Sequence, residues 1–349
     1  MNNIDLTKYH LRTDLIIENN ELTHEKETIE GIEITKSSQD GNYITISFED
    51  ITNYETREKV GKILEKVLKE ILEKNHINED DECLIIGLGN IKSTPDSLGV
   101  KVVNDILITK HLFKYGNIKE GIRQVSSFTP GVMANTGLES SNIIKAIINE
   151  EKPKFVIVID ALASLSIDRI NKTIQITDTG IHPGSGIGNN RKEISQKTIG
   201  IPVIAIGVPT VVSSTTIVYD TIEYLFKHIS YIKEHESLNK LTFTKSKNYK
   251  NKIKNQTLTE EEQNTLLGLF GTLTNYEKRT LINEVLTDIN LDLIVTPSEI
   301  DFLIDKLSNL IASAINNSLH KEVSNKYDLI INKFWFFIFK LAMKIRKKI

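Results

Sequence analysis

This chain has little cysteine, no excess of charge of either sign and no long apolar run, and each lack excludes a class of protein. One cysteine, Cys83, occurs in 349 residues. No disulfide can therefore form within the chain, and such cysteine usage is typical of a reducing compartment. With 43 basic and 46 acidic residues, the net charge is −3. The chain therefore lacks the global basic field that would predict direct nucleic-acid binding, and it lacks an acidic block that would predict a disordered tail.

The two ends of the chain lack the apolar length that targeting or membrane spanning requires. The first residues, MNNIDLTKYHLRTD, have no apolar core and do not predict a secretory signal, so we expect a cytoplasmic protein. The last segment, Tyr327–Ile349, contains the run FWFFIF followed by basic residues. This run is too short for a bilayer, which needs about 20 residues. The segment predicts either a helix on a membrane surface or, the more common case, an amphipathic helix packed on the body or on another subunit.

The most informative stretch is KFVIVIDALAS, residues 154–164. Phe155–Ile159 is an unbroken apolar run rich in β-branched residues, which indicates a strand buried on both faces of a parallel sheet. Asp160 follows immediately, and an unpaired buried carboxylate is costly. Because sites in open α/β sheets are built at the carboxyl ends of strands, Asp160 is the first candidate catalytic residue.

A second stretch has the same design. Cys83–Leu88 predicts another buried strand, with Cys83 as an unreactive buried thiol, and the loop that follows carries Asp96. If the two strands are neighbours, Asp96 and Asp160 lie at one edge, where two carboxylates can share a proton as an acid/base hydrolase requires. The structural alternatives are that Asp96 caps the next helix and that Asp160 binds backbone N–H groups in a turn.

The order of predicted elements indicates an α/β fold with a mainly parallel sheet, flanking helices and further helices towards the C-terminus. Helical periodicity covers Glu55–Asn75, Leu98–Leu112, Glu139–Ile148, Thr215–His228, Thr259–Phe270, Tyr276–Leu286 and Ser298–Leu319. Further strands are expected at Gly31–Thr35 and Tyr43–Phe48, as an exposed antiparallel pair, and at Gln124–Phe128, Thr173–Thr177 and Ile201–Val208. Residues 233–258 are polar and predict a solvated excursion.

The glycine-rich stretch 178–188 carries the supporting candidates Asp178, His182, Gly184 and Gly186. Asp178-Thr-Gly matches the tripeptide of pepsin-like proteases, but its flanking residues do not, and the α/β alternation contradicts an all-β fold. Asp178 is therefore either a third site carboxylate or a turn former. His182 either binds a metal with Asp96 and Asp160, acts as acid/base, or is a hydrogen-bonded loop histidine. The glycines lack the spacing of a Walker phosphate loop and suit tight turns near a substrate backbone.

Several longer motifs occur together in this chain. They are YHLRTDL at residues 9–15, IGLGN at 86–90, TPDSLG at 94–99, PGVM at 130–133, IDALAS at 159–164, DTGIHPGSG at 178–186, the stretch 200–210 and LIVTP at 293–297. In these motifs the chain resembles the germination proteases, or spore proteases, of endospore-forming bacteria over nearly all of residues 4–321.

The resemblance implies a homotetrameric endopeptidase of the forespore and spore core, made as a zymogen. It would degrade small acid-soluble spore proteins during germination, cutting after Glu or Asp and before an apolar residue. The implied fold is shared with hydrogenase maturation proteases, and the essential aspartates of the family map onto Asp96 and Asp160. The family is described as an atypical aspartic protease with no cofactor. The equivalent cleft of maturation proteases binds nickel, so a metal-dependent hydrolase using Asp96, Asp160 and His182 stays an alternative.

The resemblance also implies self-cleavage between Asp14 and Leu15. Residues 1–14 would form a propeptide, residues 15–324 the protease domain, and residues 325–349 a basic aromatic tail outside the family pattern. Leu11 and Ile16 stand where substrates prefer an acidic residue and alanine. An alternative of another class is a non-catalytic spore protein that this tail tethers to a membrane.

Overall fold

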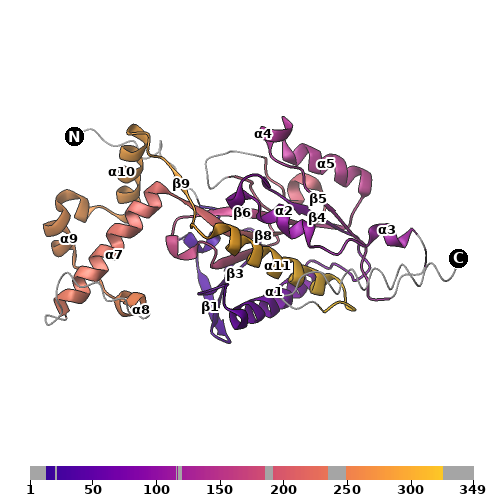
Figure 1. Ribbon diagram of the computed structural model, residues 1–349, viewed down its shortest axis with the longest axis horizontal. Helices are drawn as coiled ribbons and strands as arrows, with labels where there is room; N and C mark the ends of the chain where they lie inside the picture. The colour runs from indigo at the N-terminus through magenta and orange to yellow at the C-terminus, as the bar shows by residue number, and fades with distance from the viewer. Residues whose placement is uncertain are drawn as a thin grey trace. The chain divides into compact units, whose positions relative to one another are not determined.

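A computed structural model describes residues 13–19, 22–114, 116, 120–184, 192–234 and 249–324 (Figure 1). The chain forms two compact units. The sheet unit comprises the described residues of Thr13–Ser164, Asp168–Val211 and Thr296–Ile349. The helical unit comprises those of Leu165–Ile167 and Val212–Val295. The predicted propeptide, apart from Thr13 and Asp14, and the tail at 325–349 lie outside the described residues.

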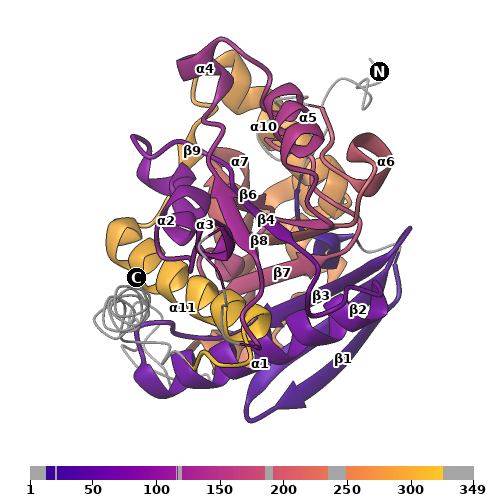
Figure 2. The ribbon, with the colours of Figure 1, turned by 90° about the vertical axis from the view of Figure 1, so that its right-hand side faces the viewer.

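The sheet unit contains one mixed sheet, with strands in the order β1-β2-β3-β7-β8-β6-β4-β5. Strands β5, β4 and β6 are parallel. The antiparallel strands β1, β2, β3 and β7 extend the sheet through β8 (Figure 2). The bounds are β1 His24–Ile29, β2 Ile32–Ser38, β3 Asn42–Ser47, β4 Cys83–Gly87, β5 Val125–Phe128, β6 Phe155–Ser164, β7 Thr173–Thr177 and β8 Val203–Ser213. The predicted α/β class is confirmed.

The two predicted buried strands, β4 and β6, are neighbours in the parallel part. Every residue of β4 is buried, and Gly87 at its carboxyl end pairs with Ile159 of β6. β6 does not stop at Asp160, as the sequence suggested, but continues to Ser164. Asp160 therefore lies within β6, at the level where its partner β4 ends.

The expected exposed pair at 31–35 and 43–48 is wrong in one respect. β2 and β3 do pair antiparallel, but Ile34, Ile44 and Ile46 are buried because β3 also pairs with β7 and so belongs to the main sheet. The sequence analysis missed β1, whose mostly polar residues form an exposed edge strand. A turn at Glu30-Gly31 joins it to β2, and both residues have positive φ, as a two-residue hairpin requires.

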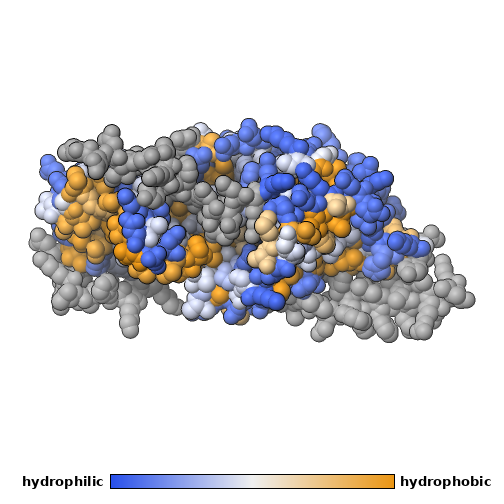
Figure 3. All heavy atoms as spheres, turned by 90° about the horizontal axis from the view of Figure 1, so that it is seen from above, coloured by the Kyte–Doolittle hydropathy of each residue, from blue (hydrophilic) through white to orange (hydrophobic). Residues whose placement is uncertain are grey.

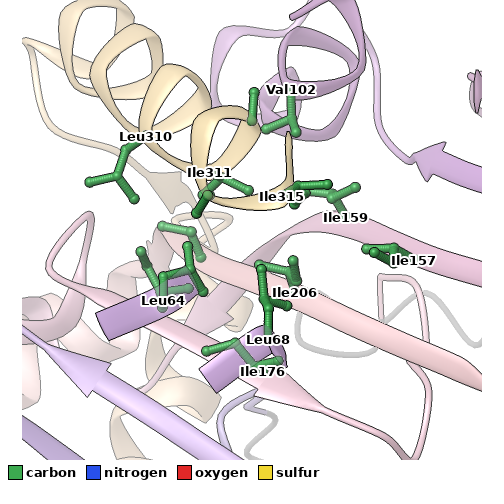
Figure 4. Close-up of a cluster of buried hydrophobic side chains, with 14 of the residues drawn as sticks. Leu64, Leu68, Val102, Ile157, Ile159, Ile176, Ile206, Leu310, Ile311 and Ile315 are labelled. Atoms are coloured by element: carbon green, nitrogen blue, oxygen red, sulfur yellow. The ribbon is translucent and has the colours of Figure 1, made fainter. Parts of the chain in front are cut away.

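Three helices cover one face of the sheet: α1 Tyr54–Lys74, α2 Leu98–Asn104 and α11 Ile300–Leu319. The predicted stripe on α1 is confirmed, and Asn53 caps the helix by accepting a hydrogen bond from the Thr56 amide. The core beneath these helices is built from side chains of α1, α2, α11 and the strands. It includes Leu64, Leu68, Val102, Ile157, Ile159, Ile176, Ile206, Leu310, Ile311 and Ile315 (Figure 4). Burying each such side chain contributes about 1.5–3 kcal/mol.

The single helix predicted over Leu98–Leu112 is wrong. α2 ends at Asn104, and a short helix, α3 Lys110–Phe113, follows after a break. In the break, the Leu107 amide donates to the Asn316 side chain of α11 at 2.9 Å, and the Thr109 amide donates to the Val125 carbonyl of β5. These long-range bonds replace the helical ones, and local periodicity cannot reveal them.

The other face of the parallel part is covered by α5 Ser140–Glu151. Ile144 and Ile148 of α5 pack with apolar residues of β4 and β6. Shorter segments complete the unit: η2 Ile16–Glu18, η3 Thr94–Asp96, α4 Met133–Thr136 and α6 Gln196–Ile199. The parallel strands are thus apolar on both faces, as predicted.

The helical unit contains α7 Ser214–Glu234, α8 Tyr249–Ile253, α9 Glu260–Leu267, η6 Gly268–Thr272, α10 Asn275–Asp288 and β9 Ile294–Val295. Capping boxes open α9 at Thr259 and Glu262, and α10 at Thr274 and Glu277. Part of the expected polar excursion, 235–248, lies outside the described residues, but Ile253 and Leu258 are buried. Among the helices that the structure describes, none has the length and apolar character needed to cross a bilayer.

Candidate active site at the carboxyl edge of the sheet

Asp160 is 5% exposed, and β6 holds it at the edge where the parallel strands end. Its Oδ1 accepts a hydrogen bond from the amide of the next residue, Ala161, at 2.9 Å. Val158 and Leu162, two residues away on either side, pack on the face opposite the α1/α11 core. Because side chains alternate along a strand, Asp160 lies on that same face.

The loop after β4 folds back so that Asp96 reaches the same edge. The Asn90 amide donates to the Asp96 carbonyl at 2.8 Å and closes the loop. Gly89 permits this closure because it has φ of +104° and a Cβ there would lie 1.9 Å from the Asp96 carbonyl oxygen. A Cβ on Gly99 would lie 2.4 Å from the carbonyl oxygen of Ile159, the residue before Asp160. The Asp96 loop and the Asp160 segment are thus packed against each other.

The alternative that Asp96 caps the helix after it is wrong. Asp96 ends the 3-10 turn η3, and the residue before α2 is Ser97. The Ser97 hydroxyl itself donates back to the Thr94 carbonyl at 2.8 Å. The turn therefore holds Asp96 at partial exposure ahead of the helix, and the sequence pattern of a cap was misleading.

Asp178 has a structural role in joining two strands. Its Oδ1 accepts from the Asn42 amide at 2.8 Å, and its Oδ2 accepts from the Asn42 side chain at 2.6 Å. These bonds connect the end of β7 to the start of β3. Of the two interpretations, turn former is therefore the one that the contacts favour.

His182 lies in a loop whose base is fixed by reciprocal backbone bonds between Ile181 and Ile194, both 2.9 Å. Its side chain is 62% exposed, and its Nε2 lies 4.0 Å from Glu193 Oε1. Gly184 has φ of +73°, while Gly186 lies outside the described residues. Within the described parts of the chain, no three His, Cys, Asp or Glu side chains gather as a metal-binding set. The proposed trio with Asp96 and Asp160 has no support here.

A pocket of about 730 Å³ opens on the face of the sheet opposite α1 and α11. Its floor comes from neighbouring strands, with Tyr43 on β3, Gln175 on β7, Gly207 on β8 and Leu162 on β6. His182, Thr13 and Asp14 also line it. The pocket thus contains one residue of the predicted cleavage junction, and it reaches β6 two residues from Asp160.

The junction itself is docked on the sheet. Leu15 is 1% exposed and packs with Ile17 and Leu162. The Ala163 amide donates to Asp14 Oδ2 at 2.9 Å. Gln175 binds the backbone on both sides of Leu15: its Nε2 donates to the Asp14 carbonyl at 3.0 Å, and its Oε1 accepts from the Ile16 amide at 2.8 Å.

Sequence analysis missed Gln175. The available signal was an uncharged polar residue at the centre of the otherwise alternating strand TIQIT. Such a residue is buried at little cost only if it finds partners, and here the partners come from a segment 159 and 161 residues away. No local pattern encodes that pairing.

Two buried titratable groups lie in the core, outside the site. Burial raises the pKa of the Cys83 thiol, which agrees with the prediction of an unreactive cysteine. Burial, with the nearby positive charge of Arg123, lowers the pKa of His320 to about 4. The neutral imidazole accepts a hydrogen bond at Nδ1 from the Arg123 amide at 3.1 Å.

A family model described as "Germination protease" matches residues 9–330. The chain belongs to the germination protease family. It is 43% identical over 355 residues to germination proteases from Bacillus cereus (strain AH187) and Bacillus mycoides (strain KBAB4), with 92% of this chain and 96% of each relative covered. Among solved structures, a NiFe hydrogenase maturation protease, HycI from Thermococcus kodakarensis KOD1, is similar at 19% identity and a TM-score of 0.26. That likeness covers 41% of this chain and 80% of HycI, and it is too weak to define the fold.

Membership in the germination protease family makes this chain a protease and confirms the resemblance seen in its motifs. The match includes Asp96, Asp160 and the docked junction at Asp14–Leu15. These residues are therefore the candidates for the chemistry and for processing.

Proposed function

We propose that this chain is an endopeptidase that starts the breakdown of small acid-soluble spore proteins during germination, in the forespore and spore core. It cuts after Glu or Asp and before an apolar residue, with Asp96 and Asp160 as the catalytic pair. The observation that carries the proposal is the close packing of the Asp96 loop on the backbone beside Asp160, at the carboxyl edge of the sheet.

The mechanism follows from two carboxyl groups at one edge. One is ionised and takes a proton from a water held between them, while the other is protonated and hydrogen-bonds the carbonyl that is attacked. The protonated group then donates its proton to the leaving amine. Asp160 is well buried and Asp96 half-buried, so the two sit in different environments, as a pair with divided roles requires. Backbone N–H groups of residues 178–182, which line the pocket, hold the substrate backbone or the developing oxyanion.

The chain is made as a zymogen that cuts itself between Asp14 and Leu15. This junction has the acidic-then-apolar order of the proposed cleavage rule. Leu15 is buried in the docked state, so a second molecule can cut the junction only after it leaves this position. The alternative is a cut made within the same molecule.

Self-association into a homotetramer is supported by the helical unit, which exposes many large apolar side chains. Figure 3 shows apolar surface on the helical unit. The exposed side chains include Leu266, Leu267, Leu269, Tyr276, Val285, Ile289 and Leu293, with Leu269 80% exposed. Exposed apolar surface of this kind marks protein–protein contact sites. Light scattering on Leu269→Lys tests this, and an unchanged mass would contradict contact through this surface.

The decisive experiment is intact mass spectrometry of the wild-type chain and Asp160→Asn, incubated at mildly acidic pH. We expect loss of residues 1–14 in the wild type and a processing rate at least about 100-fold lower in the variant, since a general acid or base contributes about 10²–10⁴-fold. Asp301→Asn is the matched control, because Asp301 is an exposed carboxylate on α11. Equal trimming of wild type and Asp160→Asn would contradict the proposal and indicate a contaminating protease.

A further inference from the structure

One face of the sheet is built to receive an extended chain. Thr35, Thr45, Gln175 and Gly207 lie in register across β2, β3, β7 and β8. They occupy the face opposite the α1/α11 core, since Ile44 and Ile46 on either side of Thr45 belong to that core. This row is polar or small; Gln175 and Gly207 line the pocket described above, and Thr35 and Thr45 are buried beside it. A polar, hollow face suits a peptide backbone better than a helix.

The face already holds a short piece of such a chain at Asp14 and Leu15, where Leu15 is extended (φ −98°, ψ 118°) before η2 begins at Ile16. The segment runs beside β6, where the Asp14 amide donates to the Ala163 carbonyl at 3.3 Å and the Ala163 amide donates back to the Asp14 carboxylate. Gln175 takes the place of a strand partner on the other side, with one donated and one accepted bond. Neither Gln175 bond depends on the identity of a side chain in the bound segment, so both suit any peptide in this position.

The residue after the acidic one enters an apolar site. Leu15 packs with Leu162, and partly buried Ile181 closes the cluster. Leu162 leans over Gly207, where an added Cβ would lie 2.3 Å from Leu162 Cδ1. The missing side chain at Gly207 therefore allows Leu162 to serve as the floor of this site.

The groove also has the right position for the proposed chemistry. Asp160 precedes Leu162 by two residues on the same face of β6, which corresponds to roughly 7 Å along a strand. The site that holds the residue after the cut is thus next to a proposed catalytic aspartate.

We propose that the groove formed by Leu162, Ala163, Gln175 and Ile181, here called the junction groove, recognises the acidic–apolar pair of peptide substrates. Ala163 receives the acidic side chain through its amide, Gln175 holds the backbone, and Leu162 with Ile181 selects the apolar residue. The chain's own Asp14–Leu15 occupies this groove as a substrate would. The inference rests on the proposed endopeptidase function and adds where that enzyme reads its substrate.

The first test measures binding without catalysis. The full chain carries Asp160→Asn and Leu15→Asp, so that it neither cuts nor fills its own groove, and the probe is a labelled peptide of residues Thr13–Asn19. We expect binding by fluorescence anisotropy, and affinity about tenfold lower after adding Leu162→Ala or Gln175→Ala. Ile181→Ala is a second variant in case Leu162→Ala fails to fold, as judged by thermal unfolding. The same peptide with Leu15→Asp is expected to bind at least tenfold more weakly.

Matched controls are Leu138→Ala, an exposed leucine, and Gln196→Ala, which lines the same pocket without supplying any of the bonds to residues 14–16 given above. Both should leave affinity unchanged. Two outcomes would overturn the groove as the recognition site. One is equal affinity for the two peptides, and the other is unchanged affinity in Leu162→Ala, Ile181→Ala and Gln175→Ala.

The second test measures cleavage by chains with Asp160 intact. It compares the peptide of residues Thr13–Asn19 with the same peptide carrying Ala in place of Leu15. We expect Leu162→Ala to lower the preference for Leu over Ala after the cut by about tenfold in kcat/KM, and Gln175→Ala to raise KM for both peptides alike. A peptide that binds in the groove but is never cut would contradict the endopeptidase and leave the groove standing. Cleavage with unchanged preference in Leu162→Ala would contradict the groove and leave the endopeptidase standing.

Discussion

The two halves of the sheet differ in how many of their faces are covered. Around β4 and β6, helices cover both faces, with α1, α2 and α11 on one side and α5 on the other. Around β3 and β7, helices pack only on the α1/α11 side, while the opposite face is polar, is partly covered by the segment at residues 14–16 and carries the pocket. The covered half therefore supplies a rigid edge for Asp96 and Asp160, and the open half supplies a surface for a peptide. The candidate site lies where they meet, along β6.

The largest expected effect comes from disturbing the covered half at its edge. Gly99→Ala places a Cβ within 2.5 Å of two backbone carbonyl oxygens, those of Ile159 and Leu88. Since backbone atoms of packed strands cannot move aside cheaply, we expect a loss of about 3 kcal/mol or more in the free energy of unfolding. Urea unfolding measures it. Gly200→Ala, where nothing lies within 4 Å but φ is +84°, is the control and should cost about 1 kcal/mol. A smaller effect at Gly99 than at Gly200 would contradict the tight packing of the Asp96 loop.

A pair of neighbours on β3 compares the two faces directly. Ile46 lies in the α1/α11 core, and Ile46→Ala should cost about 3 kcal/mol in unfolding free energy. Thr45 faces the other way, and its buried hydroxyl has no hydrogen-bond partner among the described residues. Thr45→Val keeps the shape and removes an unsatisfied group, so we expect stability unchanged or raised by up to about 1 kcal/mol. Marked destabilisation by Thr45→Val would show that the hydroxyl has a partner and that this face is less open.

The third effect depends on pH and concerns the α11 side of the covered half. His320 has a pKa lowered from 6.5 to about 4 by burial, so in that interval the unfolded chain binds a proton that the folded chain does not. The contribution of the neutral His320 to stability is therefore present above pH 6.5 and is lost as the pH falls towards 4. We expect this loss to lower the free energy of unfolding by about 2–3 kcal/mol.

His320→Gln keeps an acceptor for the Arg123 amide but cannot titrate. We expect the difference in unfolding free energy between wild type and variant to shrink or reverse between pH 7 and pH 4.5, measured by urea unfolding. A difference that stays constant over this range would mean that His320 has the same pKa in both states.

Local patterns in the sequence were sufficient for most of the covered half. Buried strands such as Cys83–Gly87 and Phe155–Ile159 are continuous apolar runs, and α1 has a full amphipathic stripe, so periodicity alone identifies them. The adjacency of β4 and β6 was only a condition in the sequence analysis, and the structure fulfils it. Asp96 and Asp160 were predicted to reach one edge of the sheet if these strands were neighbours, and the packing of their segments agrees.

The open half was harder to predict because long-range pairing decides it. β1 carries mostly polar residues and exists because it pairs with β2. The covered half has one such case, since the break between α2 and α3 depends on Asn316, more than 200 positions away. Gln175 acquires its role only when residues 14–16 dock beside it. In each case the stabilising partner is remote, and no window of neighbouring residues contains it.

The lone cysteine at the start of β4 makes the chain its own probe of unfolding. Cys83 is fully buried in the strand that pairs with both β5 and β6. An alkylating reagent can reach the sulfur only when this central strand is exposed, so labelling follows the rarest opening of the sheet unit and ignores motion at its edges. With no second thiol to label, the uptake of a single adduct reports the population of that open state directly.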